Sequence, residues 1–322
     1  MDVDTQLLLR ESIHELLARD NGDLVAGLAQ LGWRDVVRDD PVAAVDLLFT
    51  EQGKAGRASA ALDTVLIDAA GGDLCEPEPG HRPPAVLHPL GAATCISSMD
   101  GRLLIDGVTL TDPASAAGCV VAADDAASTV FLLAPDRLAT AAGAVGGFDP
   151  ASALYRVRVD VSIAETEARK CDWTGAVTAG RRALAAELAG NASAMLGIAV
   201  EHVRQRTQFG RPIGVNQTPR HRLAQCHTQL AGARELIDVA CKTGTWWDAW
   251  VAKTYAGCAW DATSRACLQV CGAIGLTCEH RLGRYVKRAT ILDALYGSWR
   301  MSLQHIGTTL LETERIPAGP PL

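Results

Sequence analysis

The sequence predicts an α+β fold in three consecutive parts: helices, a β domain, then a helical bundle. Apolar residues recur every three or four positions over 1–73 and again over 166–322, which is the spacing of amphipathic helices. Between these regions, over 74–165, apolar residues alternate with polar ones or form short runs, as in strands. We therefore expect an N-terminal helical domain, a linker with a small β-barrel or sandwich domain, and a C-terminal four-helix bundle.

The composition limits the classes of function. Hydrophobic residues make up 48% and charged residues 21% of the 322 residues, as in ordinary globular proteins, and the net charge is −7. A nucleic-acid partner is not expected, because binding to phosphate backbones needs clustered cations. Neither a secretory leader nor an uncharged span long enough for a membrane is expected, so the predicted location is the cytoplasm. The ten cysteines contain no CxxC pair and are predicted to be reduced, without a metal site.

The first region is predicted to be helical and short. The segments "ARDNGD" and "VRDDP" interrupt its apolar stripes, and Pro41 stands where a helix would begin. The residues that form the stripes are Leu7, Leu8, Ile13, Leu16, Leu17, Ala44, Leu47 and Leu48.

The middle region opens with "CEPEPGHRPPAVLHPLG", which is rich in Pro and Gly and predicts a connection. Strand signals follow: "RLLIDGVTLT" around an expected Asp-Gly turn, "GCVVAAD", "TVFLLA", and the strictly alternating "LYRVRVDVSI". Together they predict about six or seven strands.

In the third region, long helices are expected from Trp173 onward, joined by short loops in an antiparallel bundle. Four tryptophans at 246, 247, 250 and 260 are expected in the bundle core or a subunit interface, with a wall for a bulky substrate as the alternative. The first two stripes consist of Leu184, Leu188, Met195, Ala199 and Val203, and of Leu223, Cys226, Leu230, Ile237 and Cys241; a third covers 246–271.

The stretch "RQRTQFGRPIG" at 204–214 is the first candidate site. Arg206 could form a bidentate pair with a phosphate, Phe209 offers an aromatic face, and Gly210 allows close backbone approach. From these residues alone, the favoured interpretation is a plain helix end, with cations that complement the helix dipole and glycine as the cap. The second cluster shifts the balance towards a ligand site.

A second cluster, "QVCGAIGLTCEHRLGRYVKRA" at 269–289, follows another long helix. Taken together, "RxQFGRPIG" and "QxxGxxG…RLxRYxxRA" about 60 residues later resemble the acyl-CoA dehydrogenase family, as do the helix "ALAAELAGNASAMLGIAVEHVRQRTQFGRPI" and the α–β–α order. The resemblance is strong over 175–300, weaker over 20–70 and faint in the β domain.

This resemblance implies an FAD enzyme that removes the α proton and the β hydride of an acyl-CoA thioester, with an electron-transfer flavoprotein as acceptor. In dimers of the family, the two matching loops hold the adenosine–pyrophosphate half of the neighbouring subunit's FAD. The residues to which the resemblance assigns this role are Arg206, Gln208, Phe209, Gly210, Gln269, Gly272 and Gly275.

The chain departs from the family where the catalytic base belongs. The usual glutamate position in "ILDALYGSWR" holds Tyr296, and the alternative position on the bundle helix holds Cys258. Tyrosine has an ordinary pKa near 10, so it is a poor base at neutral pH. Asp261 and Asp293 are expected to be solvated helix residues, with a displaced base as the alternative. The family's "TEPxxGSD"-like segment, which lines the flavin ring, is also missing.

The residues that would bind a partner's FAD are thus present. The residues that would contact the chain's own flavin ring and substrate are absent. This pattern resembles the short, base-lacking β-type subunit of the α2β2 acyl-CoA dehydrogenases that act on steroid side chains, and implies a catalytic α-type partner. The alternatives are a flavin monooxygenase of the same fold, a non-catalytic scaffold protein, and a self-sufficient dehydrogenase with an unrecognised base.

Overall fold

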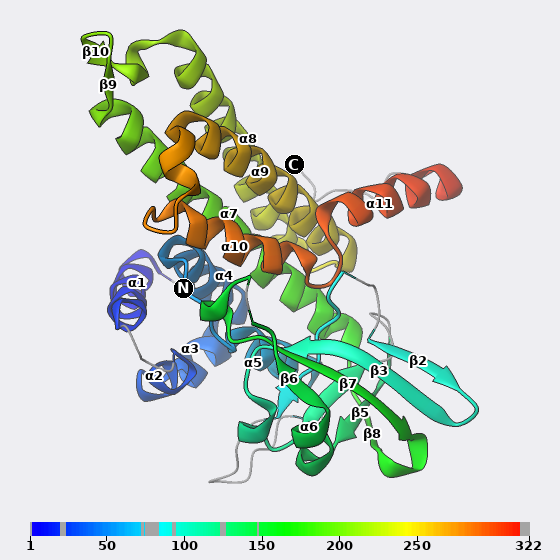
Figure 1. The fold of residues 1–322 in the computed structure, drawn as a ribbon. Helices are drawn as coiled ribbons and strands as arrows, with labels where there is room; N and C mark the ends of the chain where they lie inside the picture. The colour runs from blue at the N-terminus through cyan, green and yellow to red at the C-terminus, as the bar shows by residue number, and fades with distance from the viewer. Residues whose placement is uncertain are drawn as a thin grey trace.

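The computed structural model describes residues 2–19, 24–71, 74, 84–91, 95–122, 127–146 and 148–315. The chain runs from a group of helices through a twisted β region to a long helical bundle (Figure 1), which confirms the predicted fold class. Cys75 and most of the predicted connection, 75–83, lie outside the described residues. The N-terminal helices are α1 (Val3–Ala18), α2 (Leu24–Gln30), α3 (Trp33–Asp39), α4 (Pro41–Ala55) and α5 (Ala61–Ala70).

Helix α4 begins where the sequence predicts. The side chain of Asp40 caps it by accepting a hydrogen bond from the backbone N–H of Ala43 at 3.1 Å, and Pro41 occupies the first turn, where no backbone N–H is needed. The helix ends at Gly56, which adopts a φ of 62°.

The β region holds two four-stranded sheets, with strand orders β1-β4-β5-β8 and β2-β3-β7-β6. The described residues of this region thus form eight strands, where about six or seven were predicted. They are β1 (Ala85–Val86), β2 (Ile96–Met99), β3 (Arg102–Thr109), β4 (Cys119–Ala122), β5 (Thr129–Leu133), β6 (Ala142–Ala144), β7 (Tyr155–Ser162) and β8 (Glu167–Lys170), with α6 (Pro135–Ala141) between β5 and β6.

The predicted turn at Asp106–Gly107 is wrong, because β3 runs straight through it. The turn lies between β2 and β3, at Asp100 and Gly101, whose φ angles of 52° and 73° suit a two-residue hairpin loop. Gly107 is required for another reason: a Cβ there would come within 2.8 Å of the carbonyl oxygen of His88. This glycine therefore permits close strand contact rather than a turn.

The bundle is built around α7 (Trp173–Gln205), a helix of 33 residues. The predicted first stripe is fully buried, and so is the second except for the half-buried Cys241. Of the four tryptophans, Trp250 and Trp260 are buried in the core, whereas Trp246 and Trp247 are half-buried. The guanidinium of Arg181 stacks 5.0 Å above the ring of Trp246. The other helices are α8 (Gln217–Thr243), α9 (Trp246–Cys271), α10 (Leu282–Ala294) and α11 (Trp299–Thr313).

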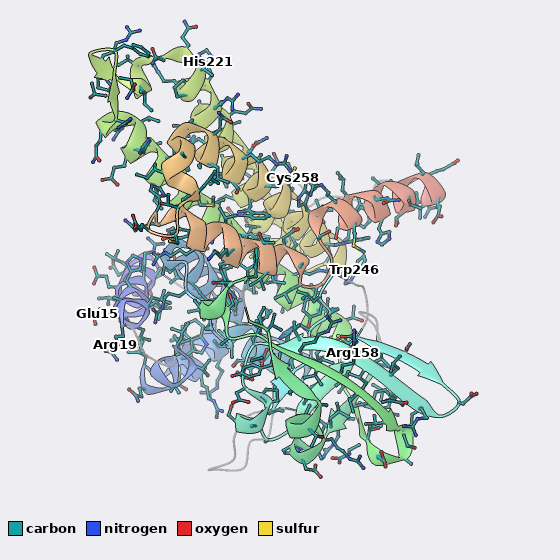
Figure 2. The ribbon with its side chains drawn as sticks, in the orientation of Figure 1. Glu15, Arg19, Arg158, His221, Trp246 and Cys258 are labelled. Atoms are coloured by element: carbon teal, nitrogen blue, oxygen red, sulfur yellow. The ribbon has the colours of Figure 1, made fainter. Side chains whose placement is uncertain are left out.

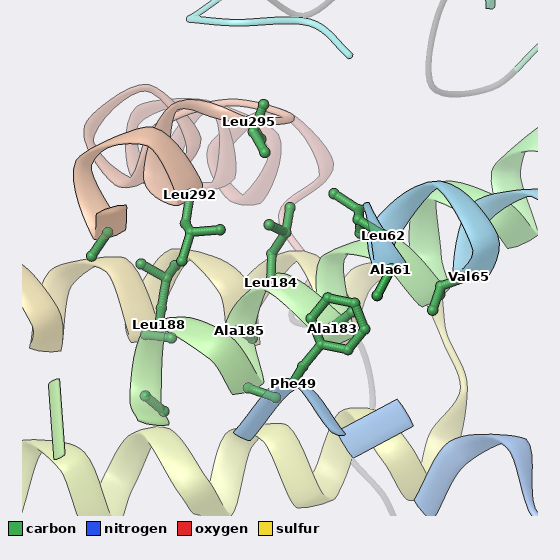
Figure 3. Packing of buried hydrophobic residues seen from close by; sticks show 14 of the residues in the cluster. Phe49, Ala61, Leu62, Val65, Ala183, Leu184, Ala185, Leu188, Leu292 and Leu295 are labelled. Carbon is green, nitrogen blue, oxygen red and sulfur yellow. The ribbon is translucent and has the colours of Figure 1, made fainter. Parts of the chain in front are cut away.

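Helix α7 lies at the centre of the core. Figure 3 shows Leu184 and Leu188 of α7 between Leu292 of α10 and Phe49 of α4. Helices α4 and α7 touch backbone to backbone, since a Cβ on Gly190 would overlap the carbonyl oxygen of Thr50. The crossing therefore depends on glycine.

Helix α7 is also the only helix among the described residues that is long and apolar enough to cross a membrane. In this structure 72% of its apolar window is buried inside the protein. Its apolar composition is accounted for by its place in the core.

Candidate functional site

The first predicted site cluster forms a β-hairpin at the far end of α7 (Figure 1). The helix ends at Gln205, Arg206 turns into extended backbone, and the strands β9 (Thr207–Gln208) and β10 (Arg211–Pro212) pair antiparallel. The carbonyl oxygen of Arg206 accepts a hydrogen bond from the N–H of Ile213 at 2.8 Å, which closes the base of the hairpin. Gly210 is thus part of a hairpin turn and not a helix cap.

The turn of this hairpin has an unusual residue at its tip. Phe209 and Gly210 have φ angles of 53° and 77°, the pattern of a type I′ turn, which normally has Asn or Asp followed by Gly. A phenylalanine in this conformation costs about 1–2 kcal/mol. The same side chain is 98% exposed. Neither backbone preference nor packing within this chain explains a phenylalanine here.

Positive charge surrounds the hairpin. Among the described residues, the guanidinium of Arg206 has no hydrogen-bond or ion-pair partner, whereas Arg211 donates to Oδ1 of Asn216 at 3.1 Å. Partial burial, followed by the charges of His280 and Arg206, lowers the pKa of His202. His280 of the second cluster therefore lies close enough to the last turn of α7 to influence His202.

The second cluster follows α9 as the 3-10 helix η6 (Gly272–Leu276). Gln269 and Gly272 are exposed, and Gly272 has a φ of 66°. Gly275 is buried, where a Cβ would lie 3.0 Å from that of Cys271. Ile274 is 52% and Leu276 is 76% exposed, so this loop also presents apolar side chains to its surroundings.

Tyr296, at the predicted base position, points into the protein. It is 3% exposed and has a φ of 54°. Its hydroxyl lies 3.2 Å from Nδ1 of His88, and Nε2 of His88 lies 2.7 Å from Oδ1 of Asp63. The second carboxylate oxygen of Asp63 accepts from the backbone N–H of Val86 at 3.3 Å. A buried chain of hydrogen bonds therefore fills the place of the base.

Sequence reasoning missed His88 and Asp63. The two residues are 25 positions apart in different domains, and Tyr296 is 208 positions from His88, so no local pattern links them. The only signal is the histidine in "VLHPL", an apolar stretch where a polar side chain needs a partner.

A buried lysine holds the turn that carries Tyr296. Lys253 is 2% exposed and donates to the carbonyl oxygens of Asp293 at 3.0 Å and Gly297 at 2.6 Å. The carboxylate of Asp293 accepts from the N–H of Trp299 at 3.0 Å. Asp293 is buried, so the prediction of a solvated helix residue is wrong: it caps α11.

The second predicted base position also lacks a base. Cys258 lies midway along α9 (Figure 2), and burial, followed by the charge of Asp261, raises the pKa of its thiol. A raised pKa keeps the thiol protonated at neutral pH. Asp261 is paired with Arg265 at 3.1 Å and Arg300 at 3.4 Å, so it too is not a freely solvated residue.

The arrangement thus offers an exposed, cationic and aromatic hairpin, and a filled interior at both base positions. The first suits a flat anionic ligand held from outside the chain. The second leaves no carboxylate at either base position to take a proton. In the part of the chain that the structure describes, no three His, Cys, Asp or Glu side chains are grouped to hold a metal.

Comparisons with known proteins agree with this architecture. Residues 173–311 match the family model described as acyl-CoA dehydrogenase, C-terminal domain. The chain is 33% identical over 169 residues to acyl-CoA dehydrogenase IpdE2 of Mycobacterium tuberculosis, covering 52% of each. It is 32% identical over 137 residues to the short-chain-specific acyl-CoA dehydrogenase of Megasphaera elsdenii, covering 41% of this chain and 36% of that one. The matched segments span about half or less of these relatives' length.

Solved structures share the fold over almost the whole chain. The ChsE4-ChsE5 complex from Mycobacterium tuberculosis matches with a TM-score of 0.73 and 20% identity over 99% of both chains. A variant of the Tcur3481-Tcur3483 steroid ACAD matches with a TM-score of 0.71 and 20% identity over 97% of this chain and 98% of that one. Residues 173–311 therefore form an acyl-CoA dehydrogenase C-terminal domain, and the chain as a whole shares the fold of these solved structures.

Proposed function

We propose that this chain is the β-type subunit of an α2β2 FAD-dependent acyl-CoA dehydrogenase and completes the FAD site of a catalytic α-type partner. The observation that carries the proposal is Phe209, held in a strained backbone conformation and 98% exposed. It lies near Arg206, whose guanidinium has no partner among the described residues. Strain and exposure of this kind are retained where a binding site needs them. The neighbouring subunit's cofactor and surface would bury both side chains.

The residues at this end of the bundle fit the adenosine–pyrophosphate half of FAD. Arg206 would hold phosphate oxygens, and Phe209 would cover a flat ring or its surroundings. Gln208 and Gln269 add amide donors and acceptors, and the positive φ angles of Gly210 and Gly272 let backbone approach the ligand. When bound, FAD would act as the acceptor of two electrons.

The interior of the chain supports a non-catalytic role. Proton abstraction from an acyl-CoA needs a carboxylate within reach of the substrate. Here the hydroxyl of Tyr296 is hydrogen-bonded to the buried His88. Helix α5 also packs directly on α7, where a Cβ on Gly180 would lie 2.8 Å from Leu66. The partner would therefore carry the base and the reacting end of the substrate, and the chain would be inactive alone.

The substrate and surroundings follow from the relatives. One similar structure is named as a steroid ACAD, which supports the CoA thioester of a steroid side chain as the substrate. Another is named as a two-component complex, which supports a heteromeric assembly. We further propose an electron-transfer flavoprotein as the electron acceptor. The nine cysteines among the described residues are all free, which agrees with a cytoplasmic location.

Co-expression with a full-length acyl-CoA dehydrogenase that carries the glutamate tests the proposal. The expected product is a yellow complex with half as many flavins as chains, while this chain alone binds little flavin. Arg206→Gln should weaken FAD binding about tenfold, because one charge-assisted interaction is lost. Arg102→Gln, at an exposed ion pair on β3, is the matched control and should change nothing.

Other results would favour the alternatives. Full flavin occupancy in a homo-oligomer of this chain would rule out the β-subunit role, and substrate-dependent reoxidation of its reduced flavin would indicate a monooxygenase. An unchanged flavin content in the Arg206→Gln complex would point to a scaffold.

A further inference from the structure

A large cavity lies away from the hairpin, between the N-terminal helices, one edge of the β domain and the first turns of α7. Its volume is about 1470 Å³, larger than the roughly 300–1,000 Å³ of usual small-molecule sites. Ala179 and Arg182 line it on α7, whereas Arg206 stands at the other end of the same helix. The cavity is therefore separate from the proposed FAD-binding surface.

The cavity wall is mainly apolar. Helices α3, α4 and α5 contribute Trp33, Leu48 and Val65, and the β domain contributes Leu132. An apolar wall of this extent favours a ligand with a substantial hydrocarbon body.

The charged groups in the wall differ in their partners. Four of the five carboxylates that line the cavity form ion pairs: Asp46 with Arg234, Asp63 with His88, Glu165 with Arg137, and Glu167 with Arg169. Oδ1 of Asp46 accepts no hydrogen bond within the described residues, and the fifth carboxylate, Asp68, is exposed, as is Arg34. The guanidinium of Arg182 is half-buried in the same wall and has no hydrogen-bond or ion-pair partner among the described residues.

An unpaired, partly desolvated cation is costly, and an anion from outside would offset that cost. Burial lowers the pKa of Arg182, in keeping with its half-buried place in the wall. A second polar group in the wall is also unused: Oγ1 of Thr111 is shielded from solvent and has no hydrogen-bond partner within the described part of the chain. A ligand with an anionic end and a further polar atom would satisfy both groups.

We propose that this cavity binds an apolar carboxylate, with its carboxylate on Arg182 and its hydrocarbon body along the apolar wall. Arg182 is the one partly buried guanidinium in the wall that has no ion pair among the described residues, and it matches a single negative charge. The site does not depend on flavin or on a partner subunit, so it stands or falls independently of the proposed β-subunit role.

The test is a fluorescence titration of the full-length chain with cis-parinaric acid and, separately, with its uncharged methyl ester. The acid is expected to bind, and the ester to bind about tenfold more weakly because it lacks the charge. Arg182→Gln should weaken binding of the acid to the level of the ester and leave the ester unaffected, while Arg182→Lys should retain part of the preference. Arg222→Gln, an exposed arginine near the hairpin end of α8, is the matched control.

A second variant checks the location without touching the charge. Ala29 is exposed to the cavity and outside the packed core, so Ala29→Trp should fill space and weaken both probes, with the circular dichroism spectrum unchanged. No binding of the acid, equal binding of acid and ester, or unchanged binding in both Arg182→Gln and Ala29→Trp would overturn the proposal.

Discussion

The hydroxyl of Tyr296 lies 3.2 Å from Nδ1 of His88, in a part of the protein that is almost fully shielded from water. Since Nε2 of His88 faces the carboxylate of Asp63, the histidine donates there, and its Nδ1 accepts from the tyrosine. This contact joins the turn between α10 and α11 to the strand region and to α5. Tyr296, at the position of the family's base, therefore has a structural role as a hydrogen-bond donor.

Replacing Tyr296 should therefore change stability. Tyr296→Phe leaves the buried Nδ1 of His88 without a donor, which should lower the free energy of unfolding by about 1–3 kcal/mol. Tyr296→Glu puts the family's carboxylate back, but in a buried site where His88 is already paired with Asp63. It should therefore destabilise the chain more and confer no dehydrogenase activity on the isolated protein. Urea unfolding and an acyl-CoA assay check both outcomes. A Tyr296→Glu chain that turned over substrate alone would show that the interior is open.

Two glycines of α7 provide a matched pair of variants that tests the contact between α4 and α7. Gly190→Ala should destabilise the protein by about 1–3 kcal/mol, because the added Cβ overlaps the backbone of α4. Gly197 has no atom within 4 Å of such a Cβ, so Gly197→Ala should stabilise the same helix by about 0.5–1 kcal/mol. Thermal unfolding of the two variants should shift in opposite directions. Shifts of the same sign would show that α4 and α7 are not in backbone contact.

Phe209 should show opposite effects alone and in the complex. Phe209→Asn suits the type I′ turn and removes an exposed aromatic ring, so the isolated chain should gain about 1 kcal/mol and aggregate less. The complex with the α-type partner should lose flavin or dissociate, because the aromatic contact is gone. Urea unfolding of the isolated Phe209→Asn chain and the flavin content of its complex check these two outcomes. A complex unaffected by the substitution would remove Phe209 from the interface.

The cysteines should differ in reactivity with pH. Burial and Asp261 raise the pKa of Cys258, so its thiolate appears only at a higher pH than in an ordinary cysteine. Cys278 is exposed, and iodoacetamide should label it first at pH 8, with labelling of Cys258 rising as the pH is increased further. Peptide mass spectrometry measures both rates. Faster labelling of Cys258 at pH 7 would mean an activated thiolate there.

Repetitive features were predicted well, and features that join distant segments were not. The buried stripes of α7 and α8 follow from apolar spacing, because a packed helix must repeat its contacts every turn. The Asp106–Gly107 pair misled because the same dipeptide serves a turn at 100–101 and a close strand contact at 106–107. The chain from Tyr296 through His88 to Asp63 was out of reach, since its members meet only after all three parts have packed.

The hairpin at the end of α7 carries a consequence for assembly. Its paired strands and the closing hydrogen bond between Ile213 and Arg206 fix the shape of the tip within this chain. A surface organised before association loses little conformational entropy on binding, so more of its contact energy contributes to affinity. A loop of the same composition that ordered only on contact would make a weaker and slower interface.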